Sequence, residues 1–319
     1  MVQSLLDFQN LNQNHVLKIM NQSLKLKADF KKQNLEKSVP QKSILGTAGL
    51  LFFEPSTRTR FSFQTACIRS GIVPMILDSP GGSSLEKGES IADTIYNLEA
   101  MGPLFFVVRC SDEINLREIS LNIGVPILNA GWGIQGHPTQ ALLDITTLFE
   151  RWKTLENKNI LFVGDVAHSR VFSSHLQLSK IMNYNLGFCA PECFKTDLDP
   201  ESNLIQNFQN MDQALNWADA VITLRVQKER HAITENKIGD QTIAGLSLDE
   251  YRRLYGLNST RAKNLKPEGL ILHPGPINYG VEIEKNITED SRSVILQLVE
   301  NGVFIRQVII QNLISGDLK

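Results

Sequence analysis

The sequence predicts an α/β protein with two domains, and three observations support that prediction. The chain has 319 residues, a length that suits two domains, each large enough to bury its own core. Short apolar runs followed by polar turns and helical patterns recur along it, as in α/β folds. The charged stretch 151–159 interrupts this order, and a new strand follows directly. We therefore expect a first domain over 1–150 and a second over 151–290.

The first domain is expected to alternate strands and helices. Asn12 is placed to cap a helix whose apolar stripe runs from Val16 to Phe30. A later helix, behind a polar turn, ends before Gly71, because glycine favours a helix stop. The other expected elements are strands over 50–53, 72–77, 104–108 and 125–128, a Gly- and Ser-rich loop over 78–90, and helices over 91–101 and 138–149.

The second domain begins with a strand over 160–166 and a helix that Arg170 opens. Gly164 stands alone where a Gly-x-Gly-x-x-Gly fingerprint would mark a dinucleotide fold, which argues against a nucleotide cofactor and an NAD-dependent dehydrogenase. The later expected elements are a strand ending near Leu224, a polar loop with short helical pieces over 225–261, a strand over 270–278 that ends in a Pro-Gly-Pro turn, and one or two helices over 291–314 with a break at Gly302.

Composition excludes several classes of function. Hydrophobic residues make up 42% and charged residues 21% of the chain, as in ordinary globular proteins. The balance of 32 basic against 34 acidic residues gives a net charge of −2, which argues against nucleic acid or an anionic membrane as a partner. The amino terminus lacks the basic start and apolar centre of a signal peptide, and no run of about 18 apolar residues occurs. We expect a cytoplasmic protein.

The four cysteines are too few and too scattered for a disulfide framework. Cys189 and Cys193 could form half of a metal site, but no second pair of Cys or His at ligand spacing accompanies them. We expect free thiols in a reducing compartment, and no metal.

The polar turn after the strand over 50–53 has the composition of an anion site. Glu54 and Pro55 end the apolar run, and Ser56 to Arg60 then supply three hydroxyls and two guanidinium groups in five positions. A helix begins there, so backbone N–H groups and the positive end of the helix dipole gather at the same place. Arginine adds forked contacts to phosphate oxygens. The sequence predicts a phosphate site; the alternative is a basic surface turn in which Ser56 caps the helix.

Two further side chains lie where ligands bind. Arg109 follows the strand over 104–108, and the carboxyl end of a buried strand is a ligand position in open α/β sheets. His137 precedes Pro138, which suits the first position of a helix. A helix amino terminus disfavours imidazolium, so a neutral His137 could donate a hydrogen bond to a carbonyl oxygen. The alternatives are an arginine that emerges into solvent and a histidine that only caps its helix. Lys87, taken alone, is a solvated charge.

Several strings in the chain resemble motifs of one family, the transcarbamoylases. The resemblance is carried by Pro55-Ser-Thr-Arg-Thr-Arg60, by the loop from Ser83 to Glu89 and by the His-Pro-Thr-Gln-Ala-Leu-Leu-Asp string that starts at His137. Five such motifs occur in the expected order over nearly the whole chain. The resemblance implies two doubly wound α/β domains with parallel sheets and an active site in the cleft between them. It also implies that closing helices over 291–319 join the first domain.

The resemblance implies carbamoyl transfer, with carbamoyl phosphate bound by the first domain and the acceptor amino acid by the second, in an early step of pyrimidine synthesis. The phosphate is the leaving group, so no cofactor, metal or covalent nucleophile is required. The implied catalytic residues are Arg58, Thr59, Lys87, Arg109 and His137. The implied ligands of carbamoyl phosphate are Ser56, Thr57, Arg58, Thr59, Ser84, Lys87, Arg109, His137, Gln140, Gly275 and Pro276.

The second domain favours aspartate as the acceptor, because two carboxylates suit forked arginines. The strings Arg225 to Arg230 and His273 to Pro276 resemble the aspartate members of the family rather than the ornithine members. The implied aspartate ligands are Lys87, Arg170, Arg225 and Gln227. The alternatives are another acceptor such as ornithine, or an inactive subunit kept for assembly. The presence of all the anion and oxyanion ligands favours an active enzyme.

Three residues depart from the family pattern. Gly275 stands where larger residues are common, Tyr279 stands where an arginine is common, and Trp132 is unusual in its turn. The resemblance also implies a homotrimer in which Ser84 and Lys87 serve a neighbouring subunit's site. The sequence leaves open whether regulatory chains or other pyrimidine enzymes bind this subunit.

Overall fold

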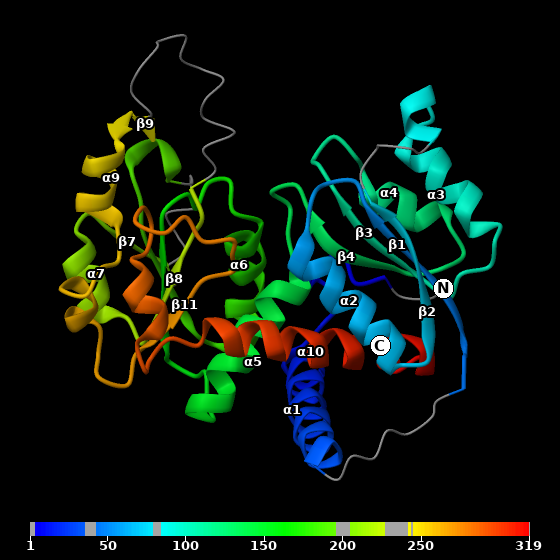
Figure 1. Cartoon of the computed structure of the whole chain (residues 1–319), viewed down its shortest axis with the longest axis horizontal. Coiled ribbons are helices and arrows are strands. Elements are labelled where there is room, and N and C mark those ends of the chain that lie inside the picture. Colours follow the sequence, from blue (N-terminus) through cyan, green and yellow to red (C-terminus); the bar gives the residue numbers. More distant parts are fainter. Residues whose placement is uncertain are drawn as a thin grey trace. The chain divides into compact units, whose positions relative to one another are not determined.

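The structure is a computed structural model that describes residues 4–35, 43–78, 84–195, 205–226, 242–243 and 245–318. The chain divides into two compact units (Figure 1). The first unit comprises Met1–Glu150, Ser173–Ile181 and Val299–Lys319, and the second comprises Arg151–Phe172 and Met182–Leu298. No helix in the described part of the chain combines the length and the apolar character that crossing a membrane needs.

The first unit is built on a four-stranded parallel sheet. Its strands are β1 (Gly46–Phe52), β2 (Ile72–Asp78), β3 (Phe106–Cys110) and β4 (Ile127–Trp132), in the order β2-β1-β3-β4. Since β2 lies on one side of β1 and the later strands lie on the other, the sheet is doubly wound. Its topological switch point lies between β1 and β3. The predicted doubly wound fold is confirmed for this unit.

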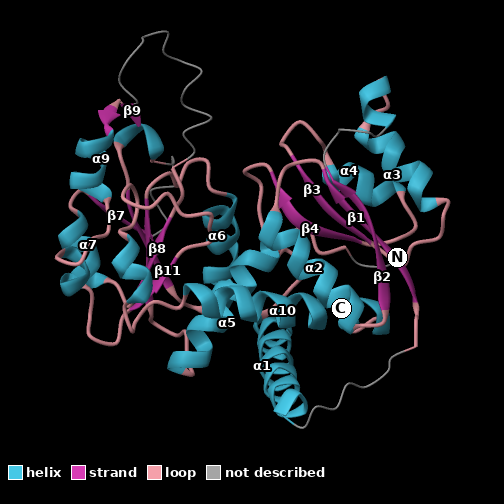
Figure 2. Cartoon of the chain, viewed as in Figure 1, coloured by secondary structure: helices cyan, strands magenta, loops and turns pink. Residues whose placement is uncertain are grey.

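Helices surround this sheet, as Figures 1 and 2 show. α3 (Ile91–Glu99) and α4 (Leu116–Asn122) pack on the face that carries Leu51, Phe106 and Val108. The other helices of the unit are α1 (Gln13–Leu35), α2 (Thr57–Arg69), most of α5 (Pro138–Trp152), most of α10 (Ile295–Ser315), the Ser173–Ile181 part of α6 (Arg170–Met182) and a short 3-10 helix, η1 (Ser84–Lys87).

β1 begins four residues before the predicted start at Leu50, because two glycines let the strand pass beneath large side chains. A Cβ atom on Gly49 would lie 2.5 Å from the Phe106 ring, and one on Gly46 would lie 2.9 Å from Leu104. An apolar run indicates only the second half of such a strand, since the first half is defined by its neighbours rather than by its own hydrophobicity.

β4 continues to Trp132, whereas the predicted strand over 125–128 ends four residues earlier. Trp132 Nε1 donates a hydrogen bond to the carbonyl oxygen of Ile114 (2.8 Å), and the ring packs on the apolar cluster that includes Leu116 and Ile119. These contacts explain why a tryptophan occupies position 132. They also place it against α4, a short helix that the sequence analysis does not predict.

The second unit is built on a five-stranded parallel sheet in the order β11-β8-β5-β6-β7. The chain again moves to one side of its first strand and then to the other, so this sheet is also doubly wound, with its switch point between β5 and β8. The strands are β5 (Asn159–Val163), β6 (Asn185–Cys189), β7 (Ile205–Phe208), β8 (Ala220–Thr223) and β11 (Leu270–Leu272), with a separate hairpin of β9 (Thr242–Ile243) and β10 (Leu246–Ser247).

Several elements of the second unit are not predicted by the sequence analysis. These are β6, β7 and α7 (Met211–Trp217), together with the 3-10 helices η2 (Glu192–Phe194), η3 (Arg261–Asn264) and η4 (Lys285–Glu289). The helix α9 (Leu248–Tyr255) lies in the loop over 225–261, for which short helical pieces are predicted. α9 begins with a capping box in which Ser247 and Glu250 exchange hydrogen bonds, and this Ser-x-x-Glu spacing was readable in the sequence. Residues 227–241 of the polar loop predicted over 225–261 lie outside the described residues.

α10 is one helix, and the break predicted at Gly302 is wrong. A Cβ atom on Gly302 would lie 2.7 Å from Arg306 Nη1 and 3.2 Å from a methyl group of Leu143 on α5. The glycine therefore serves close packing between α5 and α10 instead of ending a helix. The intrinsic cost of a mid-helix glycine, about 1 kcal/mol relative to alanine, is outweighed by this fit.

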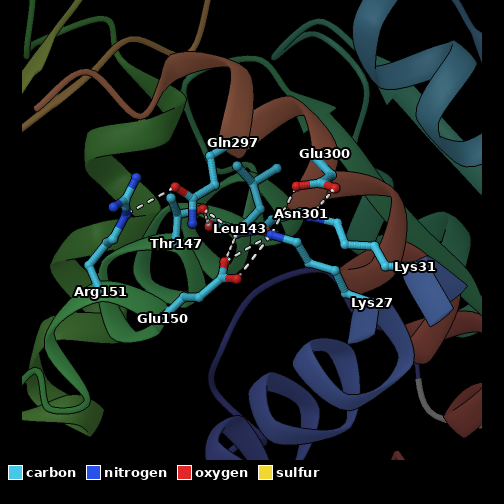
Figure 3. A network of polar contacts seen from close by, with 9 residues as sticks. All are labelled: Lys27, Lys31, Leu143, Thr147, Glu150, Arg151, Gln297, Glu300 and Asn301. Atoms are coloured by element: carbon cyan, nitrogen blue, oxygen red, sulfur yellow. Dashed lines mark hydrogen bonds and ion pairs between the residues drawn. The ribbon is translucent and has the colours of Figure 1, made fainter. Parts of the chain in front are cut away.

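A buried lysine joins α1, α5 and α10 in the first unit (Figure 3). Lys27 Nζ lies 3.0 Å from both carboxylate oxygens of Glu150, 2.7 Å from Asn301 Oδ1 and 3.0 Å from Glu300 Oε2. Asn301 also donates to Thr147 Oγ1 (2.9 Å) and to Glu150 Oε2 (3.0 Å). Every donor of the ammonium group has an acceptor, which is the condition under which a lysine can be buried.

Replacing Lys27 with methionine is expected to lower the free energy of unfolding by about 2 kcal/mol. Breaking a fully enclosed ion pair costs about 3–5 kcal/mol, but Glu150 and Glu300 keep 27% and 38% of their side chains exposed and can regain water. Lys31→Met is the matched control, since Lys31 also pairs with Glu300 (2.8 Å) but is exposed and should contribute less than about 1 kcal/mol. Urea unfolding measures both variants, and equal losses would contradict the assigned role of Lys27.

Candidate functional site

The first unit brings most of the predicted phosphate ligands to one edge of its sheet. The turn after β1 leads into residues 56–59, Arg109 lies at the carboxyl end of β3, and β4 leads to His137. Phe52 and Arg109 are register partners, and Phe53 N donates to the carbonyl oxygen of Arg109 (2.9 Å). This carboxyl edge, at the switch point between β1 and β3, is where ligands bind in doubly wound sheets.

The turn after β1 presents a helix amino terminus with its hydroxyls. α2 has 13 residues and begins at Thr57, and Ser56 occupies the N-cap position with φ −160° and ψ 99°. The Ser56 hydroxyl makes no capping hydrogen bond, so the alternative in which this serine serves only as a cap loses its basis. Thr57 and Arg58 are exposed, and Thr59 is buried at the start of the helix.

Arg60 does not contribute its charge to this turn in the way that the sequence suggests. Its guanidinium forms an ion pair with Asp78 at the end of β2 and lies over the Phe61 ring, 5.4 Å from the centroid. The turn contains two guanidinium groups, those of Arg58 and Arg60, and that of Arg60 is paired with the neighbouring strand. Arg58 therefore remains the predicted arginine ligand of phosphate in this turn.

Arg109 is positioned by groups from both neighbouring strands. Its Nε lies 3.5 Å from Glu54 Oε2, just after β1, and its Nη1 lies 3.5 Å from the carbonyl oxygen of Ala130 on β4. The Arg109 side chain is only 16% exposed. The alternative in which Arg109 emerges into solvent is therefore wrong, and the guanidinium is held at the strand ends.

His137 lies at the start of α5, as the sequence predicts. Its carbonyl oxygen accepts from Gln140 N (2.9 Å) and Ala141 N (3.2 Å), and its own N–H donates to Ser174 Oγ (2.7 Å). The residue is 4% exposed, and α5 begins at Pro138. The backbone of His137 is thus fixed on both sides, which holds the residue at the start of α5.

Gln140 lies in the first turn of α5, one helical turn from Asp144. Gln140 Nε2 donates to Asp144 Oδ1 (3.0 Å), and both residues are buried. This is the i,i+4 pairing in which helical Gln and Asp side chains meet. Asp144 is the last residue of the string that starts at His137, and the sequence predicts no role for it.

Lys87 is not brought together with the other predicted ligands within the described part of this chain. It is the last residue of η1, is exposed, and has no hydrogen bond or ion pair there with Arg58, Arg109 or His137. Ser84 begins η1, and its side chain lies outside the described residues. The role of both residues in a neighbouring subunit stays a prediction.

The second unit gathers predicted acceptor ligands at the carboxyl edge of its own sheet. Arg170 opens α6 behind β5, Arg225 follows β8 by two residues, and the Pro274–Pro276 turn follows β11. Since β11, β8 and β5 are neighbours in the sheet, the three segments start from adjacent strand ends. The two arginines follow the strands on either side of the switch point. Gln227 lies outside the described residues.

Hydrogen bonds fix the turn after β11. Gly275 N donates to His273 Nδ1 (2.8 Å), so the proton of the neutral ring is on Nε2. His273 Nε2 lies 3.3 Å from Glu282 Oε1, which also accepts from Asn278 N (2.6 Å). Asn278 Nδ2 donates to the carbonyl oxygen of Val226 (3.0 Å), and this joins the turn to the segment after β8.

The structure gives a reason for one departure from the family pattern. Gly275 has φ of 68°, a conformation that a larger side chain adopts only with strain, and a cis peptide bond joins it to Pro276. Tyr279 is exposed.

Gly164, which could be mistaken for part of a dinucleotide fingerprint, has φ of 111° and passes close to the Tyr251 hydroxyl and Leu224.

Two contributors to the site escape sequence reasoning. Glu54 looks like a strand stop but contacts Arg109, and only the strand order reveals that pairing. Asp144 could have been found from its i,i+4 spacing to Gln140. Among the described residues, no group of three or more His, Cys, Asp and Glu side chains is arranged to hold a metal ion.

Comparisons with known proteins identify the family of the chain. The carbamoyl-phosphate-binding domain of aspartate/ornithine carbamoyltransferase matches residues 3–150, and the Asp/Orn-binding domain matches residues 156–313. The aspartate carbamoyltransferase catalytic subunit of Myxococcus xanthus is 41% identical over 264 residues, which cover 82% of this chain and 84% of that protein. The corresponding subunit of Chlorobium limicola is 40% identical over 273 residues, covering 84% of this chain and 85% of that one.

A solved structure is also similar over most of its length. It is that of aspartate transcarbamoylase from Trypanosoma cruzi in complex with carbamoyl phosphate, with a TM-score of 0.82, 25% identity and coverage of 97% of this chain and 95% of that one. Both domains of the family are thus matched in sequence, and both doubly wound sheets are present. The chain belongs to the aspartate/ornithine carbamoyltransferase family.

Proposed function

We propose that the protein is an aspartate carbamoyltransferase, which transfers the carbamoyl group of carbamoyl phosphate to the amino group of L-aspartate in pyrimidine synthesis. The observation that carries the proposal is the pairing of two strand-end sites. Phosphate and carbonyl donors gather at the switch point of the first sheet, and two arginines flank that of the second. Relatives of about 40% identity are aspartate carbamoyltransferases, which supports this assignment.

In this proposal the first unit binds carbamoyl phosphate. The α2 amino terminus, Arg58 and Arg109 stabilise the charge that grows on the phosphate as it leaves. Thr59, Arg109 and His137 stabilise the oxyanion that forms when the amine attacks the carbonyl carbon, and one such donor is worth roughly 3–4 kcal/mol in the transition state. The new C–N bond replaces the C–O bond to phosphate, and the departing phosphate takes the proton that the amine loses.

The second unit binds the acceptor in this proposal. Arg170 and Arg225 suit the two carboxylates of aspartate, whereas the cationic side chain of ornithine would be repelled by the same charges. Transfer requires the two bound substrates to meet. Gln140 and the carbonyl groups around Pro274 would bind the carbamoyl NH2.

Aspartate is expected to be carbamoylated and ornithine is not, when phosphate release from carbamoyl phosphate is measured with each acceptor. Arg225→Gln should raise the KM for aspartate at least tenfold, because one lost charged contact costs about 1.5–3 kcal/mol, and should leave the affinity for carbamoyl phosphate close to that of the wild type. Faster turnover with ornithine would overturn the acceptor, and no turnover with either would favour an inactive assembly subunit.

The proposal includes a homotrimer whose sites are shared between subunits. β2 is an edge strand, and apolar side chains on it and on nearby segments are exposed. Sheet edges and exposed apolar patches are surfaces at which proteins associate. These side chains are Ile44 (74% exposed), Ile68 (63%), Leu45, Phe61, Val73, Met75 and Ile76. A second copy of the chain is the proposed partner of this apolar surface, with Lys87 reaching the site of that copy.

All four cysteines are free thiols, which supports a cytoplasmic location.

A further inference from the structure

A buried polar cluster lies beneath the predicted carbamoyl site in the first unit. Asp144 is 1% exposed, and its two carboxylate oxygens have separate partners: Oδ1 accepts from Gln140 Nε2 (3.0 Å), and Oδ2 lies 3.4 Å from His175 Nε2. The guanidinium of Arg306, on α10, is near enough to interact electrostatically with the same carboxyl group. Burying a carboxylate is costly, so its position calls for an explanation beyond packing.

The cluster decides which way the Gln140 amide faces. A carboxylate oxygen only accepts hydrogen bonds, so it must face the amide nitrogen of Gln140 and not the amide oxygen. The reverse orientation would bring two oxygen acceptors to 3.0 Å with no proton between them. With Nε2 turned toward Asp144, the Oε1 atom of Gln140 is the acceptor that the amide can present to a ligand. An amide oxygen accepts from an NH2 group and offers nothing to a methyl group or to an oxygen acceptor.

We propose that Asp144 is a positioning residue that fixes the Gln140 amide with its oxygen outward, and that this orientation makes the site select a carbamoyl group over other acyl phosphates. The inference rests on the proposed function and adds to it the origin of donor selectivity. Asp144 contacts no substrate itself; it acts through Gln140.

The surroundings hold the Asp144 carboxyl group in place. Burial raises the pKa of Asp144, while the hydrogen bonds from His175 and Gln140 and the charge of Arg306 oppose that rise. Burial also lowers the pKa of Arg306 to about 9. Arg306 Nη1 donates to Ser62 Oγ (2.8 Å), so the residue that faces Asp144 is itself held by α2, the helix of the phosphate turn. The orientation of Gln140 is thus fixed by α5, α6, α10 and α2 together.

The test compares two acyl phosphates that differ at one group. Acetyl phosphate has a methyl group where carbamoyl phosphate has NH2. The dissociation constant of acetyl phosphate divided by that of carbamoyl phosphate is therefore a ratio that isolates the NH2 contact. Gln140→Leu should lower this ratio about five- to tenfold, the value of one hydrogen bond of about 1–1.4 kcal/mol. Asp144→Leu should lower it nearly as much, and the double variant should show no further loss. The affinity for inorganic phosphate should change less than twofold in all three.

An exchange variant keeps the test decisive if Asp144→Leu fails to fold. Gln140→Glu alone sets two carboxylates against each other and should lower the ratio. Gln140→Glu combined with Asp144→Asn restores one donor facing one acceptor, with the acceptor outward, and should recover a ratio near that of the wild type. The same low ratio with and without Asp144→Asn overturns the proposal, as does an unchanged ratio in Asp144→Leu. Wild-type protein that binds carbamoyl phosphate no better than acetyl phosphate, or that shows no transfer to aspartate, instead overturns the proposed function.

Discussion

Dissociating and remixing the Arg58→Ala and Lys87→Ala variants is expected to restore carbamoyl transfer that neither variant supports alone. Arg58 lies at the amino terminus of α2, while Lys87 is exposed on η1, without a hydrogen bond or ion pair to Arg58, Arg109 or His137 in the described part of its own chain. A closed head-to-tail trimer would let each site take Arg58 from one subunit and Lys87 from the next. Each pure variant lacks one of these groups at every site, so each should be nearly inactive.

The expected recovery follows from counting. Every trimer with two subunits of one variant and one of the other contains one junction at which both side chains are intact. With random 1:1 reassembly about three quarters of the rings are mixed, so roughly a quarter of the sites should work. Phosphate release with aspartate measures this fraction.

Arg58→Ala mixed with Arg109→Ala is the matched control. Both residues lie at the same strand-end site of one chain, so no junction can combine an intact pair, and activity should stay near zero. If verified mixed trimers of Arg58→Ala and Lys87→Ala are also inactive, Lys87 does not serve a neighbour.

His137→Ala is expected to lower kcat by roughly two orders of magnitude. A donor aimed at the developing oxyanion contributes roughly 3–4 kcal/mol in the transition state, whereas the phosphate ligands that hold carbamoyl phosphate remain in the variant. The dissociation constant of carbamoyl phosphate should therefore change much less than kcat. Steady-state kinetics and equilibrium binding together separate the two effects.

His137→Asn tests the competing role of His137 as a helix cap. Asparagine is a favourable N-cap residue and keeps an N–H donor on a shorter side chain, so its thermal stability should match the wild type and its kcat should lie between those of the wild type and His137→Ala. A near-normal kcat in His137→Ala, with only a lower Tm, would reduce His137 to a cap.

The polar turn after β1 and the strand ends were predictable because their signals are local. An apolar run, a polar turn and a helical pattern follow one another between Leu50 and Gly71, and a strand that ends at a charged residue marks Arg109. The doubly wound order of the sheets followed from resemblance to a family, since strand order depends on contacts between distant segments. Local pattern alone carries no such information.

The elements and contacts that were missed depend on the tertiary structure. β1 starts at Gly46 because Leu104 and Phe106 cover its glycines, and Gly302 continues a helix because Arg306 and Leu143 lie against it. Short elements such as α4 and β7 carry too few buried residues to show a period. Gln140 lies within one helical turn of Asp144, but its other partners lie 31 residues away at His175 and far beyond that at Arg306, so no sequence window includes those two.

The first unit is assembled from three separate parts of the chain, and this sets the order in which it can mature during synthesis. Its core includes Val299–Lys319, whereas the second unit is finished at Leu298. Lys27 is made early but meets Glu300 and Asn301 only after the segment that carries them has left the ribosome. Domains generally fold as units in the order of their synthesis, and long-range contacts form slowly. Here the unit that starts first is completed after the second, so a nascent chain carries an unfinished first unit, with its predicted phosphate site, until residues Val299–Lys319 have been made.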